Sequence, residues 1–251
     1  MRATVVLSPP MSKRLIAKGV AALPPVKTAL AHGRIVITFG TTNAYVAEEL
    51  LDRPIDRGAF AAGFVDDRWN LNARLGEMGE IVLDQGKRIE PVPDELLESL
   101  RAGDVVVKGG NALDPEGVVG VLLGSASGGT VGRYAACCLA RGVELIIPIG
   151  LAKSVHTSIV DLSQEMGSGT IGLTMGLACG LFPLHGRVIT EIDALETLFP
   201  VRALHVGSSG VGAGAGAVSL LVEGDDGPVR DAFDLIESLH DEPDVQLTGR
   251  A

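Results

Sequence analysis

The chain has 251 residues, of which 46% are hydrophobic and 21% are charged, so it has ample material for a packed core and little capacity for long disorder. Its 31 acidic and 21 basic residues give a formal net charge of −10, which disfavours nucleic acid and anionic membranes as partners. The three cysteines lack the spacing of a disulfide framework or of a zinc or iron site, and we expect them as buried thiols in a reducing cytoplasm.

Three regions follow one another along the chain. Residues 1–32 are predicted to be an N-terminal helical extension, interrupted by two proline pairs and without the continuous apolar core of a signal peptide. Residues 33–185 are predicted to form an α/β domain with a Rossmann-like, mostly parallel sheet flanked by helices. Residues 186–251 are predicted to form a small α+β module with the β-α-β-β-α order of a split ferredoxin-like unit.

The α/β domain begins with a strand, a loop and a helix. Residues 34–38 form a β-branched strand, and residues 44–51 read as a helix with acidic residues on its outer side. The loop between them contains Gly40 and ends in two residues that can cap a helix, Thr42 and Asn43. A glycine-containing loop before a helix also lets an anion reach backbone amides, so this loop is either a structural cap or a binding site.

A second unit occupies the centre of the chain. Residues 104–108 form a short buried strand that ends at two glycines. A glycine-rich passage, 124–132, leads into a helix over 133–141 and then into another buried strand, 144–149. Lys153 lies just beyond the end of that strand, where polar residues gather.

Loops that leave the carboxyl ends of parallel strands lie at one edge of the sheet, where ligands bind. We therefore expect these loops to converge on a small anionic metabolite that carries a phosphate or carboxylate group. The predicted ligand-binding residues are Gly40, Thr41, Thr42, Asn43, Lys108, Gly109, Gly110, Asn111, Gly128, Gly129, Thr130 and Lys153. For Lys153 by itself, a solvated surface lysine is the competing interpretation.

Asp114 and Glu116 are the titratable groups predicted to reach this site. Burial against glycine-rich walls raises the pKa of a carboxyl group toward the range useful for general acid–base catalysis, so both are candidate catalytic residues. The alternative is a tight turn, with Asp at its first position and Pro115 at its second.

The apolar segment 171–184 is shorter than a bilayer span and is expected to be a buried helix or a packed loop. Together with the C-terminal module it could provide an interface between copies of the chain, so we expect a homo-oligomer. Neither a metal nor another cofactor is expected.

Residues 39–43, 104–114 and 150–153 together resemble one superfamily. It contains ribose-5-phosphate isomerase, glucosamine-6-phosphate deaminase, the CoA transferases, and the group of initiation factor 2B and methylthioribose-phosphate isomerase. The resemblance covers roughly residues 33–160 and implies a Rossmann-like sheet that binds a small metabolite.

The chain also departs from the patterns of these families. The run Lys108-Gly109-Gly110 is similar to the segment that supplies a substrate-binding lysine in the ribose isomerases, but the acidic Asp-Gly-Ala-Asp run is missing. Asn111, which cannot titrate, stands where the methylthioribose-phosphate isomerases have an aspartate. The glutamate nucleophile of the CoA transferases has no clear equivalent, and Glu116 is the nearest candidate.

Two functions remain open at this point. The first is an enzyme of the isomerase or CoA-transferase type that converts a phosphorylated or CoA-like metabolite. The second is a non-catalytic metabolite-binding or regulatory protein on the same fold, in which Asn111 replaces a catalytic acid.

Overall fold

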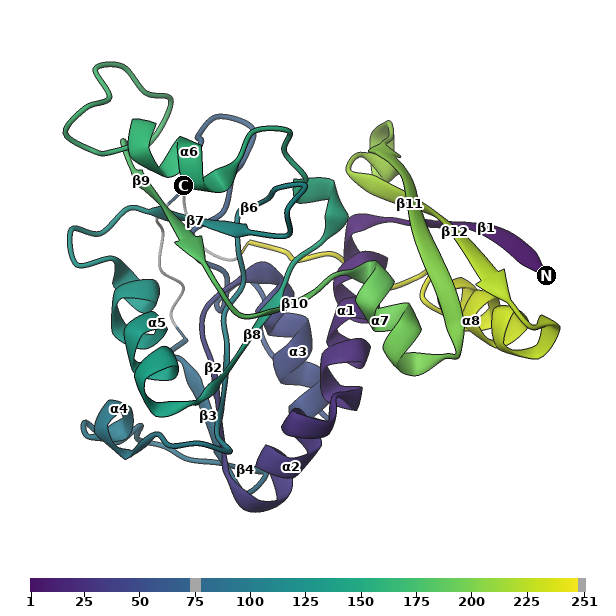
Figure 1. Cartoon of the computed structure of the whole chain (residues 1–251), viewed down its shortest axis with the longest axis horizontal. Coiled ribbons are helices and arrows are strands. Elements are labelled where there is room, and N and C mark those ends of the chain that lie inside the picture. Colours follow the sequence, from purple (N-terminus) through teal and green to yellow (C-terminus); the bar gives the residue numbers. More distant parts are fainter. Residues whose placement is uncertain (73–77, 248–251) are drawn as a thin grey trace.

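The computed structural model describes residues 1–72 and 78–247. They form an α/β fold in which a mixed six-stranded sheet is accompanied by two antiparallel three-stranded sheets (Figure 1). Within these ranges, no helix combines the length and the apolar character that crossing a membrane requires.

Four neighbouring strands of the central sheet pair in parallel, and two further strands are added at one edge by antiparallel pairing. In spatial order these are β10 (Arg187–Ile189), β8 (Glu144–Pro148), β5 (Val105–Val107), β2 (Arg34–Ile37), β3 (Ile81–Asp84) and β4 (Lys87–Arg88). The strands β2, β5 and β8 are runs of buried residues without polar alternation, as expected for strands that are covered on both faces.

Helices cover both faces of this sheet. Ile35 and Ile37 pack in a cluster with α1 (Pro9–Ala22), α2 (Pro24–His32) and α3 (Thr41–Leu51). Val36, which points to the opposite face, belongs to the cluster that includes α5 (Gly129–Arg141) and the short α4 (Leu96–Ser99). The two-residue side-chain period of a strand therefore explains how β2 joins two separate cores.

A small antiparallel sheet lies beside the ends of the central strands. It consists of β6 (Ala112–Leu113), β7 (Val119–Leu123) and β9 (Gly180–Leu184), with α6 (Ile159–Glu165) packed on β9. The expectation of a buried helix or packed loop over 171–184 is wrong, because its end is the strand β9 and Leu173 is 96% exposed. The segment has glycines in place of a helical apolar stripe, and its first half meets the loop around Asn70, whose N–H donates to the Met175 carbonyl at 2.8 Å.

The third sheet pairs the first strand of the chain with its last two strands (Figure 1). Its strands are β1 (Arg2–Leu7), β12 (Ala217–Gly224) and β11 (Val201–Ser209), and its helices are α7 (Glu191–Leu198) and α8 (Asp226–Ser238). The prediction that residues 1–32 are only helical is wrong at β1, which pairs antiparallel with β12. Val5 and Leu7 are buried there against the C-terminal elements, and this long-range pairing leaves no local sequence signal.

Candidate functional site

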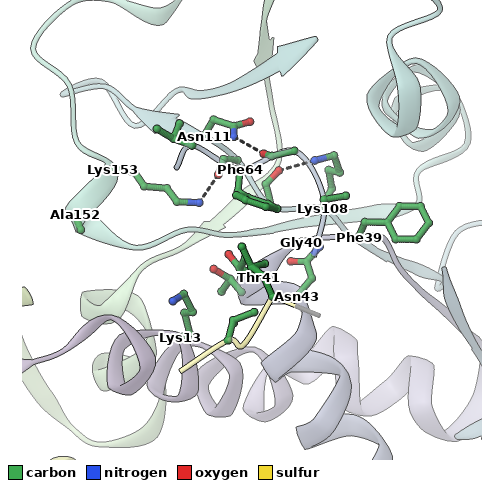
Figure 2. A pocket seen from close by; sticks show the side chains of 18 of the residues that line it. Lys13, Phe39, Gly40, Thr41, Asn43, Phe64, Lys108, Asn111, Ala152 and Lys153 are labelled. Carbon is green, nitrogen blue, oxygen red and sulfur yellow. Dashed lines mark hydrogen bonds between the residues drawn. The ribbon is translucent and has the colours of Figure 1, made fainter. Parts of the chain in front are cut away.

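The loops that follow β2, β5 and β8 meet at the carboxyl edge of the central sheet. They line a cavity of about 550 Å³ with residues 39–43, 108–111 and 152–155. Residues 62–65, Lys13 of α1 and three residues near the C-terminus, Asp244, Val245 and Leu247, complete the wall. The convergence of the three predicted loops is confirmed, and Figure 2 shows side chains from them facing one another across the cavity.

The first turn of α3 opens into this cavity. Gly40 precedes the helix with a φ of 152°, a conformation that favours glycine. In the part of the chain described, no side chain caps α3, and the first helical bond runs from the Ala44 N–H to the Gly40 carbonyl. The amides of the first turn therefore lack intrahelical acceptors and are available to an anion.

Asn43, expected as a cap, is instead the third residue of α3; it is fully buried, and its side chain does not cap the helix. Its Nδ2 donates to the Thr38 carbonyl at 2.9 Å, while its Oδ1 has no hydrogen-bond partner among the described residues. A Cβ placed on Gly109 would lie 3.4 Å from that oxygen. A buried acceptor without a donor is costly, so this oxygen suits a hydroxyl or N–H group of a ligand.

Two lysines face the first turn of α3 from the other wall (Figure 2). Lys108 is only 9% exposed, and its Nζ donates to the Gly109 carbonyl at 2.8 Å. Lys153 is half-buried, and its Nζ donates to the Gly110 carbonyl at 2.6 Å. Over the ranges 1–72 and 78–247, neither lysine forms an ion pair with a carboxylate, which is unusual for lysines with so little exposure.

The three lysines of the cavity form a chain of electrostatic neighbours. Burial and the positive charge of Lys153 together lower the pKa of Lys108 to about 8, with Glu80 opposing the shift. Burial and the positive charge of Lys13 likewise lower the pKa of Lys153 to about 8, with Glu191 opposing the shift. Lys13 itself lies 3.3 Å from Asp244 Oδ1.

A second cavity of about 440 Å³ adjoins the first, and both are lined by Phe39, Gly63, Lys108 and Asn111. Its far side contains the predicted binding residues Gly128, Gly129 and Thr130 at the start of α5, together with Arg133. Its inner wall is apolar, with Leu71 and residues 121–123. The predicted binding residues thus fall into two connected cavities, with Lys108 at the junction.

Asn111 has a structural role in this geometry. Its Nδ2 donates to the Gly63 carbonyl at 2.8 Å, and its Oδ1 accepts from the Leu122 N–H at 3.1 Å. These bonds hold the loop 62–65 against β7, so the side chain shapes both cavities.

The structure does not bring the predicted catalytic carboxylates to the site. Asp114 is buried, and its two oxygens accept from the backbone N–H groups of Val118 at 2.7 Å and Ile159 at 2.9 Å. Glu116 is exposed in the turn that follows. Neither residue lines either of the two cavities described above, and the tight-turn alternative describes their geometry.

Lys13, Asp244 and Leu247 are wall residues that sequence reasoning missed. They reach the cavity because α1 packs on α3 and because Glu242, just before the C-terminal segment, is held by Arg14 and Arg57. Their placement depends on contacts between distant parts of the chain, and no local motif around these residues predicts it.

The described residues contain no group of three or more His, Cys, Asp or Glu side chains that could hold a metal ion. Comparison with protein-family models, with curated proteins and with solved structures gives no match to this chain. In the described residues the site offers uncapped helix amides, three ammonium groups and one acceptor without a donor, and these groups define its chemistry.

Proposed function

We propose that the protein binds a small phosphorylated metabolite, with the phosphate at the first turn of α3, and acts on it as an isomerase-type or transferase-type enzyme. The parallel strands β2, β5 and β8, whose ends line the cavity, fit a Rossmann-like ligand site. The observation that carries the proposal is the burial of Lys108 and Lys153 without a carboxylate partner in the described chain, opposite free helix amides. A bound dianion would supply the missing counter-charge.

The distribution of donors and acceptors favours a hydroxylated ligand over inorganic phosphate. The amides of α3, Lys153 and Lys13 supply donors, which suit phosphate oxygens. The buried Asn43 Oδ1 supplies an acceptor, which suits a hydroxyl group on the same molecule. A sugar phosphate or a similar phosphorylated carbonyl compound combines these features.

The second cavity supports a longer ligand as the second candidate. It continues from Lys108 toward the start of α5, whose first-turn amides lack a side-chain cap in the described structure. Its apolar wall suits a chain or ring that extends beyond the phosphate site. A CoA-like ester would occupy both cavities, whereas a sugar phosphate would need only the first.

The non-catalytic alternative rests on the position of the carboxylates. Asp114 and Glu116 lie outside both cavities, so the site has no carboxylate aligned for proton transfer from either of them. The enzyme hypothesis therefore relies on the lysines, whose pKa near 8 leaves a fraction of neutral amine at neutral pH.

Isothermal titration calorimetry with inorganic phosphate, ribose 5-phosphate and a CoA ester tests this proposal. Replacing Lys153 by Met should weaken the binding of each phosphorylated ligand about tenfold or more, the loss expected for one charge-assisted contact of about 1.4 kcal/mol. The matched control is Lys27→Met, which removes an exposed lysine outside the cavity and should leave affinity unchanged. Equal affinity in the wild type and in Lys153→Met would contradict the site.

Deuterium exchange separates the enzyme from the binding protein. In D₂O, an isomerase should introduce solvent deuterium at the carbon next to the carbonyl group of its sugar phosphate, as followed by NMR. Tight binding of sugar phosphates without exchange or turnover would favour the non-catalytic alternative.

A further inference from the structure

We infer that Lys108 is a carbonyl-reactive amine that forms an imine with an aldehyde or ketone group of a phosphorylated ligand held in the cavity. This inference rests on the phosphate site proposed above and names the substrate class of that site as phosphorylated carbonyl compounds. It assigns Lys108 a covalent role, while Lys153 and Lys13 bind the phosphate.

The position of Lys108 is the first argument. It follows β5, and it lines both cavities at their junction, whereas Lys153 and Lys13 line only the first. A group attached to a phosphate at α3 must pass this junction to reach the second cavity. Lys108, whose side chain Figure 2 shows in the cavity wall, is therefore the amine that would face the body of the ligand.

The contacts of Lys108 are the second argument. Among the described residues its Nζ makes one hydrogen bond, donated to the Gly109 carbonyl, and no carboxylate lies within ion-pair distance. A donated hydrogen bond leaves the lone pair of a neutral amine free. Buried lysines beside another cation are the environment in which amines become nucleophiles near neutral pH.

The charged groups around Lys108 agree with this assignment. Burial and the charge of Lys153 lower its pKa to about 8, and Glu80 is the group that opposes them. The Glu80 side chain is only 6% exposed, and its Oε2 accepts from the Tyr134 hydroxyl at 2.7 Å and lies 3.2 Å from Arg133. Arg133 and Tyr134 thereby reduce the influence of the carboxylate on Lys108.

The reaction balances without an oxidant or a metal. The lone pair of Nζ attacks the carbonyl carbon, an N–C bond forms, and the π electrons of the C=O bond move to oxygen, which takes a proton. The resulting carbinolamine loses its oxygen as water, with one proton taken from the nitrogen, and leaves a C=N bond. Water reverses both steps. The buried Asn43 Oδ1, beside Gly109, is an acceptor for the hydroxyl of the carbinolamine.

Reductive trapping tests the inference. The intact protein is incubated with glycolaldehyde phosphate and sodium cyanoborohydride, which reduces an iminium to a stable secondary amine, and the adduct is located by peptide mass mapping. We expect one adduct at Lys108, suppression of that adduct by excess inorganic phosphate, and at least tenfold slower labelling with unphosphorylated glycolaldehyde. The exposed Lys27 and Lys87 are internal controls, since their slow labelling should be insensitive to phosphate.

Two variants of Lys108 are used, so that the test can still be read if one of them fails to fold. Lys108→Arg keeps a positive charge but cannot form an imine, and Lys108→Met removes both the charge and the amine. Either variant that retains the wild-type circular dichroism spectrum should lose the phosphate-sensitive adduct, while Lys153→Met should slow its formation without moving it.

The outcomes separate this inference from the phosphate site. An adduct on Lys153, or adducts only on exposed lysines, would overturn the role of Lys108. Calorimetric phosphate binding without a trapped adduct would also overturn it and leave the phosphate site intact. The absence of both phosphate binding and adduct would overturn both proposals.

Discussion

Helix α3 borders two regions rich in charge, and the fold treats them in opposite ways. Along its side, Arg14 and Arg57 meet Glu48, Glu49 and Glu242 in a network of ion pairs. At its first turn, Lys108 and Lys153 donate instead to the backbone carbonyls of Gly109 and Gly110.

The two regions differ in how burial is compensated. Burial alone raises the pKa of Glu48, but hydrogen bonds from Arg57 and Arg14 outweigh it and lower that pKa. In the cavity, burial prevails and the lysine pKa values fall to about 8. The chain thus neutralises the charges that its own packing needs and leaves a positive imbalance at the cavity, which is what a site for an external anion requires.

The largest effect is expected from breaking the neutralised region. Glu48→Gln removes a carboxylate whose side chain is 6% exposed and leaves two arginines partly unmatched. Loss of one partner of a buried ion pair typically costs about 3–5 kcal/mol of unfolding free energy. Urea denaturation measures the loss, with the exposed Glu95→Gln as the control. If Glu48→Gln lost no more unfolding free energy than the control, the network would contribute little to stability.

The pH dependence of the Lys108→Met variant sharpens the comparison. The folded pKa of Lys108 is about 8 and the unfolded value is 10.5, so between these values the unfolded state binds more protons and stability rises with pH. Below pH 8 both states are protonated, and the buried charge costs about 3 kcal/mol. Lys108→Met should therefore be more stable than the wild type at pH 7, with the difference shrinking from pH 8 to 10.5. Burial raises the pKa of Tyr45 to about 12, and this makes stability fall with pH above 10. Tyr45 is present in both proteins, so its contribution cancels when the stability of the variant is compared with that of the wild type. A pH-independent difference would refute the shifted pKa.

Asp114→Asn tests a buried carboxylate that is stabilised by hydrogen bonds from backbone N–H groups. Replacing one of its two acceptor oxygens by an NH₂ group sets that group against the backbone N–H of either Val118 or Ile159, so we expect a loss of about 2 kcal/mol of unfolding free energy. Ligand affinity should stay within twofold of the wild type, because the lining residues of the two cavities do not include Asp114. Glu116→Gln, in the exposed part of the same turn, should change neither quantity. Loss of ligand affinity in Asp114→Asn at unchanged stability would restore its catalytic candidacy.

The smallest effect is expected at the rim of the cavity. Asp244 is 54% exposed and pairs with Lys13, where it competes with an incoming anion. Asp244→Asn should strengthen phosphate binding about threefold to fivefold, corresponding to roughly 1 kcal/mol, with the gain reduced in high salt. Calorimetry at two salt concentrations checks this, and Asp241→Asn is the exposed control on the same segment. Weaker binding would show that Asp244 orients Lys13 instead of blocking it.

Much of the central sheet could be predicted from the sequence. The β-branched runs that end in glycine gave β2, β5 and β8, and the rule that parallel strand ends share an edge brought their loops together. These signals are local, since each depends on a few consecutive residues.

The remaining features depend on contacts between distant residues. A carboxylate in an Asp-Pro-Glu-Gly turn suits either catalysis or backbone capping, and the decision at Asp114 comes from Ile159, 45 positions later. Lys13 enters the cavity only because α1 packs against α3. Neither outcome is encoded in the neighbouring sequence.

The pairing of β1 with β12 has a consequence for how the chain is made. Arg2 lies opposite Glu223, 221 positions later in the sequence. At typical synthesis rates, roughly 10–45 s pass between the emergence of these two segments from a ribosome. During that time β1, with its apolar Val5 and Leu7, lacks the strand with which it pairs. Nascent chains that stall before β12 should therefore be the most dependent on chaperones.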